Sequence, residues 1–305
     1  MTLTPLAPEH GVAFPCLGGR TAVVASDLYA EPQLTVARSR IERWHRVLTR
    51  FHPASELSLL NANPLSHVRA SDVMCRFVTA AVDAARSTGG LVDPTLVGEI
   101  EDAGYRSDLE DVVGLDESLH LAPPRAAARP HPDARWTQVR VDREAGMVIR
   151  PPGVKLDPGG VAKGLLADIV GDSLEHCSRY LVDCCGDLRL GGADGTERTI
   201  QVDDPFGRGV LHEWDIAAGG VATSGIGKRG WIGPDARPAH HLLDPSTGRP
   251  AWTGVVQATA LAPTAAEAEW RAKAALLSGP QAGADWLGHG GVLVLDDGAH
   301  QVVEP

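Results

Sequence analysis

The chain is organised around one stretch, Val154-Lys-Leu-Asp-Pro-Gly-Gly-Val-Ala-Lys-Gly-Leu-Leu-Ala-Asp168. It predicts an extended approach, a tight turn at Pro-Gly-Gly and a helix that begins near Val161. The adjacent Gly159 and Gly160 permit positive φ and let the backbone come close to a ligand. The first turn of the helix offers unpaired N–H groups around Lys163, and these suit an anionic group such as a phosphate.

This stretch alone also fits an ordinary Gly-Gly turn that leads into a surface helix. It matches neither the P-loop nor the GxGxxG fingerprint of nucleotide-binding proteins. A second stretch, His240-His241 followed by Asp244-Pro-Ser-Thr-Gly248, places imidazoles and a carboxylate beside a rigid turn. Histidine can act as a general base near neutral pH. Adjacent residues on a strand face opposite ways, so at most one histidine serves the site, and a structural histidine is the alternative interpretation.

The composition excludes several classes of protein. The 305 residues are 43% hydrophobic and 22% charged, as in an ordinary globular protein. The formal net charge of −11 argues against a nucleic-acid or anionic-membrane binder. No apolar run is long enough to cross a membrane, and the N-terminus lacks the pattern of an export signal. Five cysteines without a C-x-x-C pair make a disulfide framework or a zinc site improbable. We therefore expect a cytoplasmic protein without membrane insertion.

Helical and strand patterns alternate along the chain without regular βαβ units. Amphipathic spacing predicts helices over 32–51, 70–87 and 264–277, the last with Thr264 as N-cap and Glu267 in a capping box. Strands are predicted over 20–26, 139–141, 147–150, 180–182, 187–190, 199–202, 213–216, 255–261, 291–295 and 301–303. The pattern favours an α+β (mixed α/β) fold, a single compact domain over 14–305 with an irregular sheet and flanking helices. Residues 1–13 are expected to form a loose lead-in.

Six motifs, in order, resemble the ApbE family of FAD:protein FMN transferases and span roughly residues 14–295. They are Ser55-Glu-Leu-Ser58 with Leu60-Asn61, Asp93-Pro-Thr95 with Gly104-Tyr105, Leu156-Asp-Pro-Gly-Gly-Val-Ala-Lys-Gly164, Gly186-Asp187, Ala222-Thr-Ser-Gly225 and His241-Leu-Leu-Asp-Pro-Ser-Thr-Gly248. The resemblance implies a T-fold-like domain. It also implies that FAD is the substrate and that a magnesium ion binds near its diphosphate.

The resemblance implies a reaction in which a Thr or Ser hydroxyl of an acceptor flavoprotein attacks the FMN-side phosphate of FAD and AMP leaves. His241 would take the hydroxyl proton, and Gly159, Gly160 and Lys163 would lie near the nucleotide. The remaining residues would shape the flavin pocket or support its loops: Asp93, Asp157, Ser224, Gly225 and Asp244. Asp157 and Asp244 fit equally well as turn-forming aspartates.

The expected magnesium site departs from the family pattern. The family places Asp and Thr four residues apart on the late helix, with a backbone carbonyl from the lysine-glycine stretch, here assigned to Ala162. This chain has Glu269 and Lys273 instead. An ammonium group offers no lone pair to a metal and repels it. Two interpretations remain: an ordinary i, i+4 surface salt bridge, or a Lys273 ammonium that replaces the metal as counter-charge to the diphosphate.

The sequence thus predicts an FAD:protein FMN transferase with doubtful magnesium dependence. An FAD-binding protein without transfer activity and an FAD diphosphatase that gives FMN and AMP are the alternatives. The altered metal pair favours binding alone, whereas His241 favours chemistry. The motifs identify neither the acceptor protein nor an oligomeric state.

Overall fold

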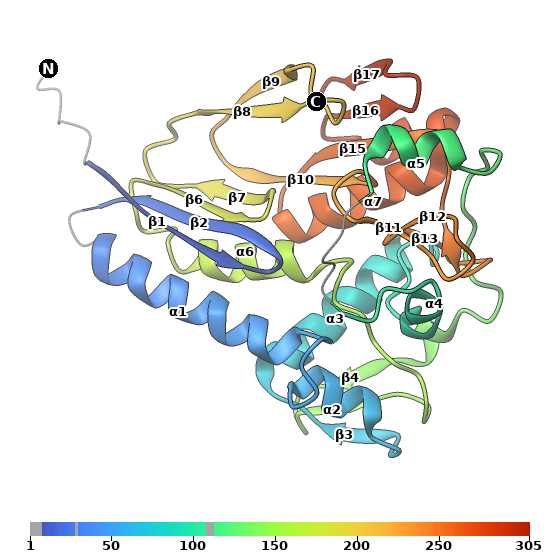
Figure 1. The fold of residues 1–305 in the computed structure, drawn as a ribbon. Coiled ribbons are helices and arrows are strands. Elements are labelled where there is room, and N and C mark those ends of the chain that lie inside the picture. The colour runs from blue at the N-terminus through green and yellow to red at the C-terminus, as the bar shows by residue number, and fades with distance from the viewer. Residues whose placement is uncertain (1–7, 28–29, 108–112) are drawn as a thin grey trace, which may run out of the picture.

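The computed structural model describes residues 8–27, 30–107 and 113–305, and an eight-stranded antiparallel sheet forms its centre (Figure 1). Its strands in spatial order are β1 (Glu9–Cys16), β2 (Gly19–Ser26), β6 (Arg179–Cys184), β7 (Asp187–Gly191), β10 (Gly219–Gly225), β15 (Val255–Ala262), β16 (Gly291–Leu295) and β17 (His300–Val303). Together with its helices, this sheet confirms the predicted mixed α+β fold.

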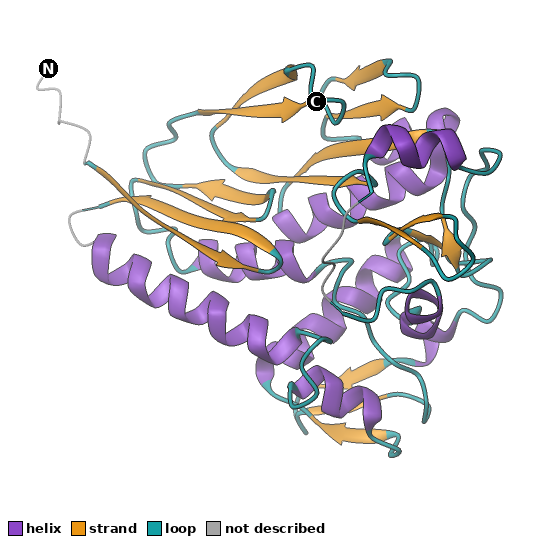
Figure 2. Ribbon diagram, in the orientation of Figure 1, coloured by secondary structure: helices purple, strands orange, loops and turns teal. Residues whose placement is uncertain are grey.

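Three long helices pack on one face of this sheet, as the purple ribbons in Figure 2 show: α1 (Ala30–Leu48), α6 (Ala162–Asp172) and α7 (Ala265–Ala282). The apolar stripe of α1 buries Leu34, Ile41 and Leu48, as its spacing predicts. The buried face of α7 is rich in alanine, so this helix lies close against β10 and β15. The expected Thr264 cap is present, because its Oγ1 accepts the Glu267 N–H at 3.2 Å.

The predicted lead-in over residues 1–13 is wrong for its second half. Residues 9–13 belong to β1, which pairs with β2 from Glu9 opposite Ser26 to Cys16 opposite Gly19. The segment carries little β-strand signal of its own. Its order comes from pairing with β2 and packing against α1, which sequence periodicity does not reveal. Residues 1–7 lie outside the described residues.

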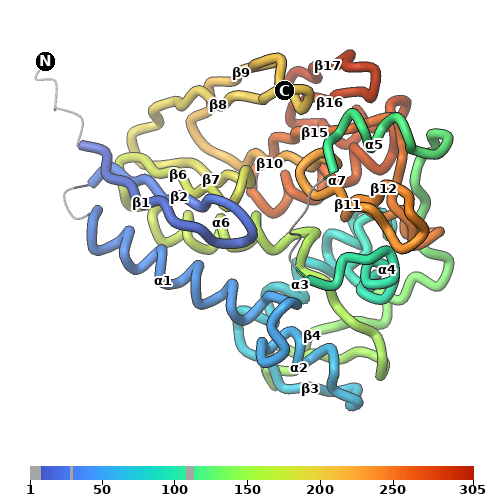
Figure 3. Tube along the Cα trace, viewed as in Figure 1, coloured from blue at the N-terminus to red at the C-terminus, as the bar shows by residue number. Residues whose placement is uncertain are grey.

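A second group of elements extends from one end of α1. In Figure 3 the tube leaves α1 for this group, passes out of it to α5 (Leu115–Leu121, green), and comes back to it before reaching α6. Its helices are α2 (Glu56–Ala62), α3 (Asp72–Ser87) and α4 (Val97–Asp102), and its three-stranded sheet joins β3 (His67–Arg69), β5 (Met147–Ile149) and β4 (Arg140–Asp142). The predicted helix over 70–87 and hairpin over 139–150 are both confirmed.

The remaining elements are short. They comprise α5 (Leu115–Leu121), η1 (Arg135–Gln138), η2 (Gly283–Trp286), the hairpin of β8 (Arg198–Asp203) and β9 (Val210–Ile216), and the two-stranded pairs β11 (Gly230–Ile232) with β12 (Pro238–His240) and β13 (Leu243–Asp244) with β14 (Arg249–Pro250). No helix among the described residues has the length and apolar character needed to span a bilayer.

Candidate active site

Two cavities, of about 540 Å³ and about 140 Å³, meet between the central sheet and the segment before α6. Both are lined by Gly159, Arg229, His241 and Lys273. The smaller one has a largely apolar wall, whereas β8 and β10 line much of the larger one. The glycine turn and the second histidine, 82 positions apart by their numbers 159 and 241, therefore meet as the sequence predicts.

The turn before α6 is held by side chains from distant segments. Asn61 bonds both backbone groups of Leu156, with Nδ2 donating to O at 2.9 Å and Oδ1 accepting from N at 2.7 Å. Asp157 Oδ1 accepts the Gly159 N–H at 2.8 Å, and its Oδ2 lies 3.1 Å from Arg50 Nε. Asp157 is therefore a turn-forming aspartate that also lines the smaller cavity.

The two glycines serve close approach rather than positive φ. Gly159 and Gly160 are absent from the positive-φ residues of the described chain. A Cβ at Gly159 would lie 2.8 Å from Asp157 Oδ1, and one at Gly160 would lie 3.1 Å from Val92 and 3.6 Å from Lys273 Nζ. Side chains at these positions would crowd the cavity wall, so glycine keeps the backbone accessible at the point where both cavities meet.

Two N–H groups at the start of α6 are already hydrogen-bonded, whereas the sequence predicts free N–H groups there. The Gly164 N–H donates to Glu269 Oε2 at 2.8 Å, and the Ala162 N–H donates to the Pro158 carbonyl at 3.0 Å. Glu269 is 2% exposed, and its carboxylate takes the place that an anionic ligand would have at this helix N-terminus. The N–H groups of Ala162 and Gly164 are therefore not free to bind a phosphate.

Lys163 belongs to a buried ion-pair network. Its Nζ contacts Asp187 Oδ2 and lies 4.0 Å from Glu269 Oε1, and Asp187 is 1% exposed. Burial would lower the pKa of Lys163, but the charges of Asp187 and Glu269 outweigh it and raise the pKa. Burial and the repulsion of Asp187 raise the pKa of Glu269 to about 7, although the two nearby lysines oppose that shift. Lys163 is thus a charged lysine whose charge is already compensated.

The interpretation of Glu269 and Lys273 as a surface salt bridge is wrong. Glu269 is buried and faces Lys163 and Gly164, whereas Lys273 Nζ donates to the carbonyl of Gly159. Among the described residues, Lys273 forms no ion pair with a carboxylate. Burial lowers the pKa of Lys273, and the charge of Glu269 only partly offsets it. Lys273 thus presents a half-buried ammonium group to both cavities.

The two adjacent histidines have different surroundings. His240 ends β12, is 1% exposed and packs edge-on against Trp252 at 4.7 Å, away from the cavities. His241 follows the strand and lines both cavities. Burial lowers the pKa of His241 well below its usual value, and the positive charges of Arg229 and Lys273 lower it further. His241 is therefore neutral at neutral pH and has a lone pair for accepting a proton.

The other predicted pocket residues divide into two groups. Asp93 lines the smaller cavity, and Ser224 and Gly225 on β10 line the larger one. Burial raises the pKa of Asp93, although its bonds from the Thr95 N–H and hydroxyl oppose the shift. Asp244 lines neither cavity. Its Oδ1 accepts bonds from the Ser246 N–H and hydroxyl and the Arg129 N–H, so it holds a turn.

Comparison with known proteins identifies the family of this chain. A sequence profile described as the ApbE family matches residues 20–295. The chain belongs to the ApbE family. Curated relatives include FAD:protein FMN transferase of Salmonella typhimurium, 28% identical over 285 residues that cover 86% of this chain and 79% of the relative. The corresponding enzyme of Treponema pallidum is 27% identical over 264 residues, 78% of this chain and 69% of the relative.

Solved ApbE structures share the whole fold. The ApbE protein of Thermotoga maritima superposes with a TM-score of 0.79 at 26% identity over 97% of both chains. The flavinyl transferase ApbE of Pseudomonas stutzeri, in its apo form, gives a TM-score of 0.77 at 20% identity. That alignment covers 99% of this chain and 96% of the other. The predicted ApbE fold is therefore confirmed.

The residues at the expected ApbE metal position do not fit magnesium. Glu269 Oε1 has no hydrogen-bond partner among the described residues, but two ammonium groups, Lys163 and Lys273, stand beside Glu269. Magnesium demands near-octahedral coordination by oxygen. Here the Gly164 N–H donates to one carboxylate oxygen of Glu269, and the Lys273 ammonium group donates to the nearby carbonyl of Gly159. Ala162 is the first residue of α6. The donor set therefore suits an ammonium better than a divalent ion.

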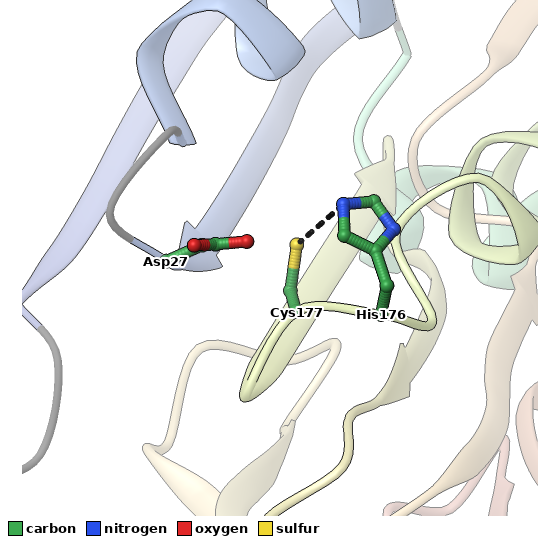
Figure 4. Close-up of side chains that lie close together, drawn as sticks. All are labelled: Asp27, His176 and Cys177. Atoms are coloured by element: carbon green, nitrogen blue, oxygen red, sulfur yellow. Dashed lines mark hydrogen bonds between the residues drawn. The ribbon is translucent and has the colours of Figure 1, made fainter.

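A separate cluster of metal-ligand residue types lies beyond the opposite end of α6. Ligand atoms of Asp27, His176 and Cys177 lie within 4.8 Å of one another (Figure 4). The amide of Gln33 already bridges two of them, with 2.8 Å to His176 Nε2 and 3.2 Å to Cys177 Sγ. These contacts satisfy the imidazole and the thiol without an ion, and the cluster shares no residue with the ApbE cavities.

Sequence reasoning missed several residues of this ApbE site. Arg229 lines both cavities, yet it stands outside every recognised motif. Arg50 contacts Asp157, donates to the Tyr105 carbonyl at 2.8 Å and lies over the Tyr105 ring. Asp187 falls in the Gly186-Asp187 motif, and that motif is the signal from which its pairing with Lys163 could have been sought.

Proposed function

We propose that this chain is an FAD:protein FMN transferase. FMN passes from FAD to a Thr or Ser hydroxyl of an acceptor protein, and AMP is released. One observation carries this proposal: a neutral His241 stands beside Arg229 and Lys273 where two cavities meet. A base next to cations, reachable from two sides, matches a reaction that joins an anionic dinucleotide to a hydroxyl.

The proposed reaction forms one P–O bond and breaks another. The acceptor hydroxyl oxygen attacks the FMN-side phosphorus, and the bridging oxygen leaves with AMP. His241 takes the hydroxyl proton, and Arg229 stabilises negative charge that develops on the phosphate oxygens. Both side chains lie in the walls of the two cavities, so positioning and charge compensation supply most of the catalysis.

The remaining site residues hold the dinucleotide. Gly159 and Gly160 keep the backbone accessible, Asp93 and Asp157 line the smaller cavity, and Ser224 and Gly225 line the larger one. Lys163 and Glu269 line the larger cavity, and the Lys163 charge is already compensated by Asp187 and Glu269 rather than free for the ligand. The Thr or Ser target of the acceptor and the cytoplasmic location remain predictions from the sequence.

The test incubates the full chain with FAD and an acceptor domain that bears a target threonine, and reads flavin fluorescence on a denaturing gel. The acceptor is expected to become labelled. His241→Ala is expected to slow labelling by about 10²- to 10⁴-fold while FAD still binds. The exposed His176→Ala serves as the matched control and keeps the wild-type rate.

The two alternatives give different products in the same experiment. Free FMN and AMP without a labelled acceptor would identify a diphosphatase. Intact bound FAD without any product would identify a binding protein. Either result, obtained with acceptors that known FMN transferases label, contradicts the transferase.

A further inference from the structure

We propose that the ammonium group of Lys273 is the built-in cation that binds the diphosphate of FAD, so that substrate binding needs no divalent metal. This inference rests on the proposed function, because it names the group that recognises the substrate. It is carried by the position of Lys273, by the absence of an ion pair between Lys273 and a carboxylate among the described residues, and by the misfit of the metal position.

The position of Lys273 is the first argument. Its Nζ donates to the carbonyl of Gly159, and both residues line both cavities. A ligand that extends from one cavity into the other must pass this ammonium group and His241. The diphosphate lies in the middle of FAD, between its two ring systems, so it belongs at the junction of the cavities.

Charge compensation is the second argument. Lys273 and Arg229 line both cavities, and Lys163 and Lys228 line only the larger one. Lys163 is paired with Asp187 and Glu269, whereas Lys273 has only a neutral carbonyl as hydrogen-bond partner among the described residues. A half-buried ammonium group without an ion-pair partner is costly by itself, and an anionic ligand would remove that cost. Lys273 is therefore prepared for a phosphate oxygen.

The arrangement of Glu269 is the third argument. Its carboxylate is fixed by the Gly164 N–H on one oxygen and faces Lys163 with the other. A divalent ion bound here would stand against two ammonium groups. If the Lys273 ammonium group is removed, FAD binding should therefore need a metal ion. Lys273→Thr together with Glu269→Asp should supply ligands for that ion.

The experiment measures the Kd of FAD and of riboflavin for the full chain, in EDTA and in magnesium. Wild-type protein is expected to bind FAD equally in both conditions. Lys273→Met should weaken FAD binding in EDTA about 10- to 100-fold, and leave riboflavin, which lacks phosphate, unchanged. Lys273→Arg should retain most of the affinity. Lys155→Met removes a lysine that pairs with Glu101 outside the cavities, and should leave both ligands unaffected.

A double variant tests for a gain of magnesium-dependent FAD binding, and not only for a loss of affinity. Lys273→Thr with Glu269→Asp should bind FAD weakly in EDTA and recover affinity when magnesium is added. Release of FAD from the wild type by EDTA, or equal FAD binding by Lys273→Met, would overturn the lysine proposal. FAD binding that resists EDTA and depends on Lys273, but without acceptor labelling, would support the lysine proposal and count against the transferase.

Discussion

Gly164 and the backbone of Ala265 are in direct contact: a Cβ at Gly164 would lie 2.4 Å from the Ala265 carbonyl oxygen. The same Cβ would lie 2.6 Å from the backbone nitrogen of Ala266. The starts of α6 and α7 therefore touch through main-chain atoms. Asp168 strengthens this junction, because its two carboxylate oxygens accept the N–H groups of Ala265 and Ala266 at 2.8 and 2.9 Å.

Gly164→Ala is expected to destabilise the protein, because the added methyl group must push two helix backbones apart. The free energy of unfolding should fall by about 1–3 kcal/mol. Gly98→Ala is the matched control, since Gly98 is an exposed helical position where a Cβ meets no atom within 4 Å. Alanine there should stabilise by about 0.5–1 kcal/mol. Denaturant titration of both variants would contradict this account if they lost stability equally.

The acid limb of kcat/KM for transfer should lie below the usual titration range of histidine. His241 must be neutral to accept a proton, and burial together with Arg229 and Lys273 lowers its pKa. Lowering the pH therefore protonates His241 only below its ordinary pKa. Arg229→Gln removes one of these charges and should move the acid limb to higher pH.

Lys228→Gln is the control for this pH profile. It removes the same charge from the preceding residue, which lines the larger cavity but is not among the groups that shift the His241 pKa. Its acid limb should coincide with that of the wild type. A limb that Arg229→Gln leaves unmoved would show that His241 is not the titrating base.

His240 should make the fold less stable in acid. Burial lowers the pKa of His240 to about 3, so the folded state holds it neutral while the unfolded state binds a proton below about pH 6.5. Its contribution to stability is complete above pH 6.5 and is lost as the pH falls. Between about pH 7 and about pH 5 the loss amounts to about 2 kcal/mol.

The measurement compares the change in unfolding free energy between these two pH values. His240→Gln should show a smaller change than the wild type, whatever its absolute stability. His120→Gln, at an exposed position on α5, should show the wild-type change. An unchanged pH dependence in His240→Gln would contradict a buried neutral histidine.

Local features of this fold could be predicted from the sequence because they depend on neighbouring residues. The Thr264 cap, the apolar stripe of α1 and the hairpin of β16 with β17 follow from spacing and turn chemistry within a few positions. The strand β1 could not be predicted in this way, since its order comes from pairing with β2. The order of the eight strands likewise depends on contacts between distant segments.

The candidate site likewise contains parts that local motifs predict and parts that depend on contacts between distant residues. The glycine turn and His241 were recognised as motifs, and the fold brings them to one place. Of the two interpretations of Glu269 and Lys273, the surface salt bridge was wrong, because helical spacing suggests that pair whereas the carboxylate binds Gly164, 105 positions away. Arg229 could not be found at all, because a lone arginine in a turn carries no periodic or spacing signal.

The aromatic side chains near the smaller cavity should make the tryptophan fluorescence of the protein sensitive to a bound flavin. Tyr105 lines that cavity and stacks on Trp231, with ring centroids 5.3 Å apart, while the Trp231 indole N–H donates to the Ala103 carbonyl at 2.8 Å. The indole is thus buried and held one ring away from any occupant. An isoalloxazine in this cavity would quench the emission of Trp231 by energy transfer. Tryptophan fluorescence would then report flavin occupancy in the unlabelled protein.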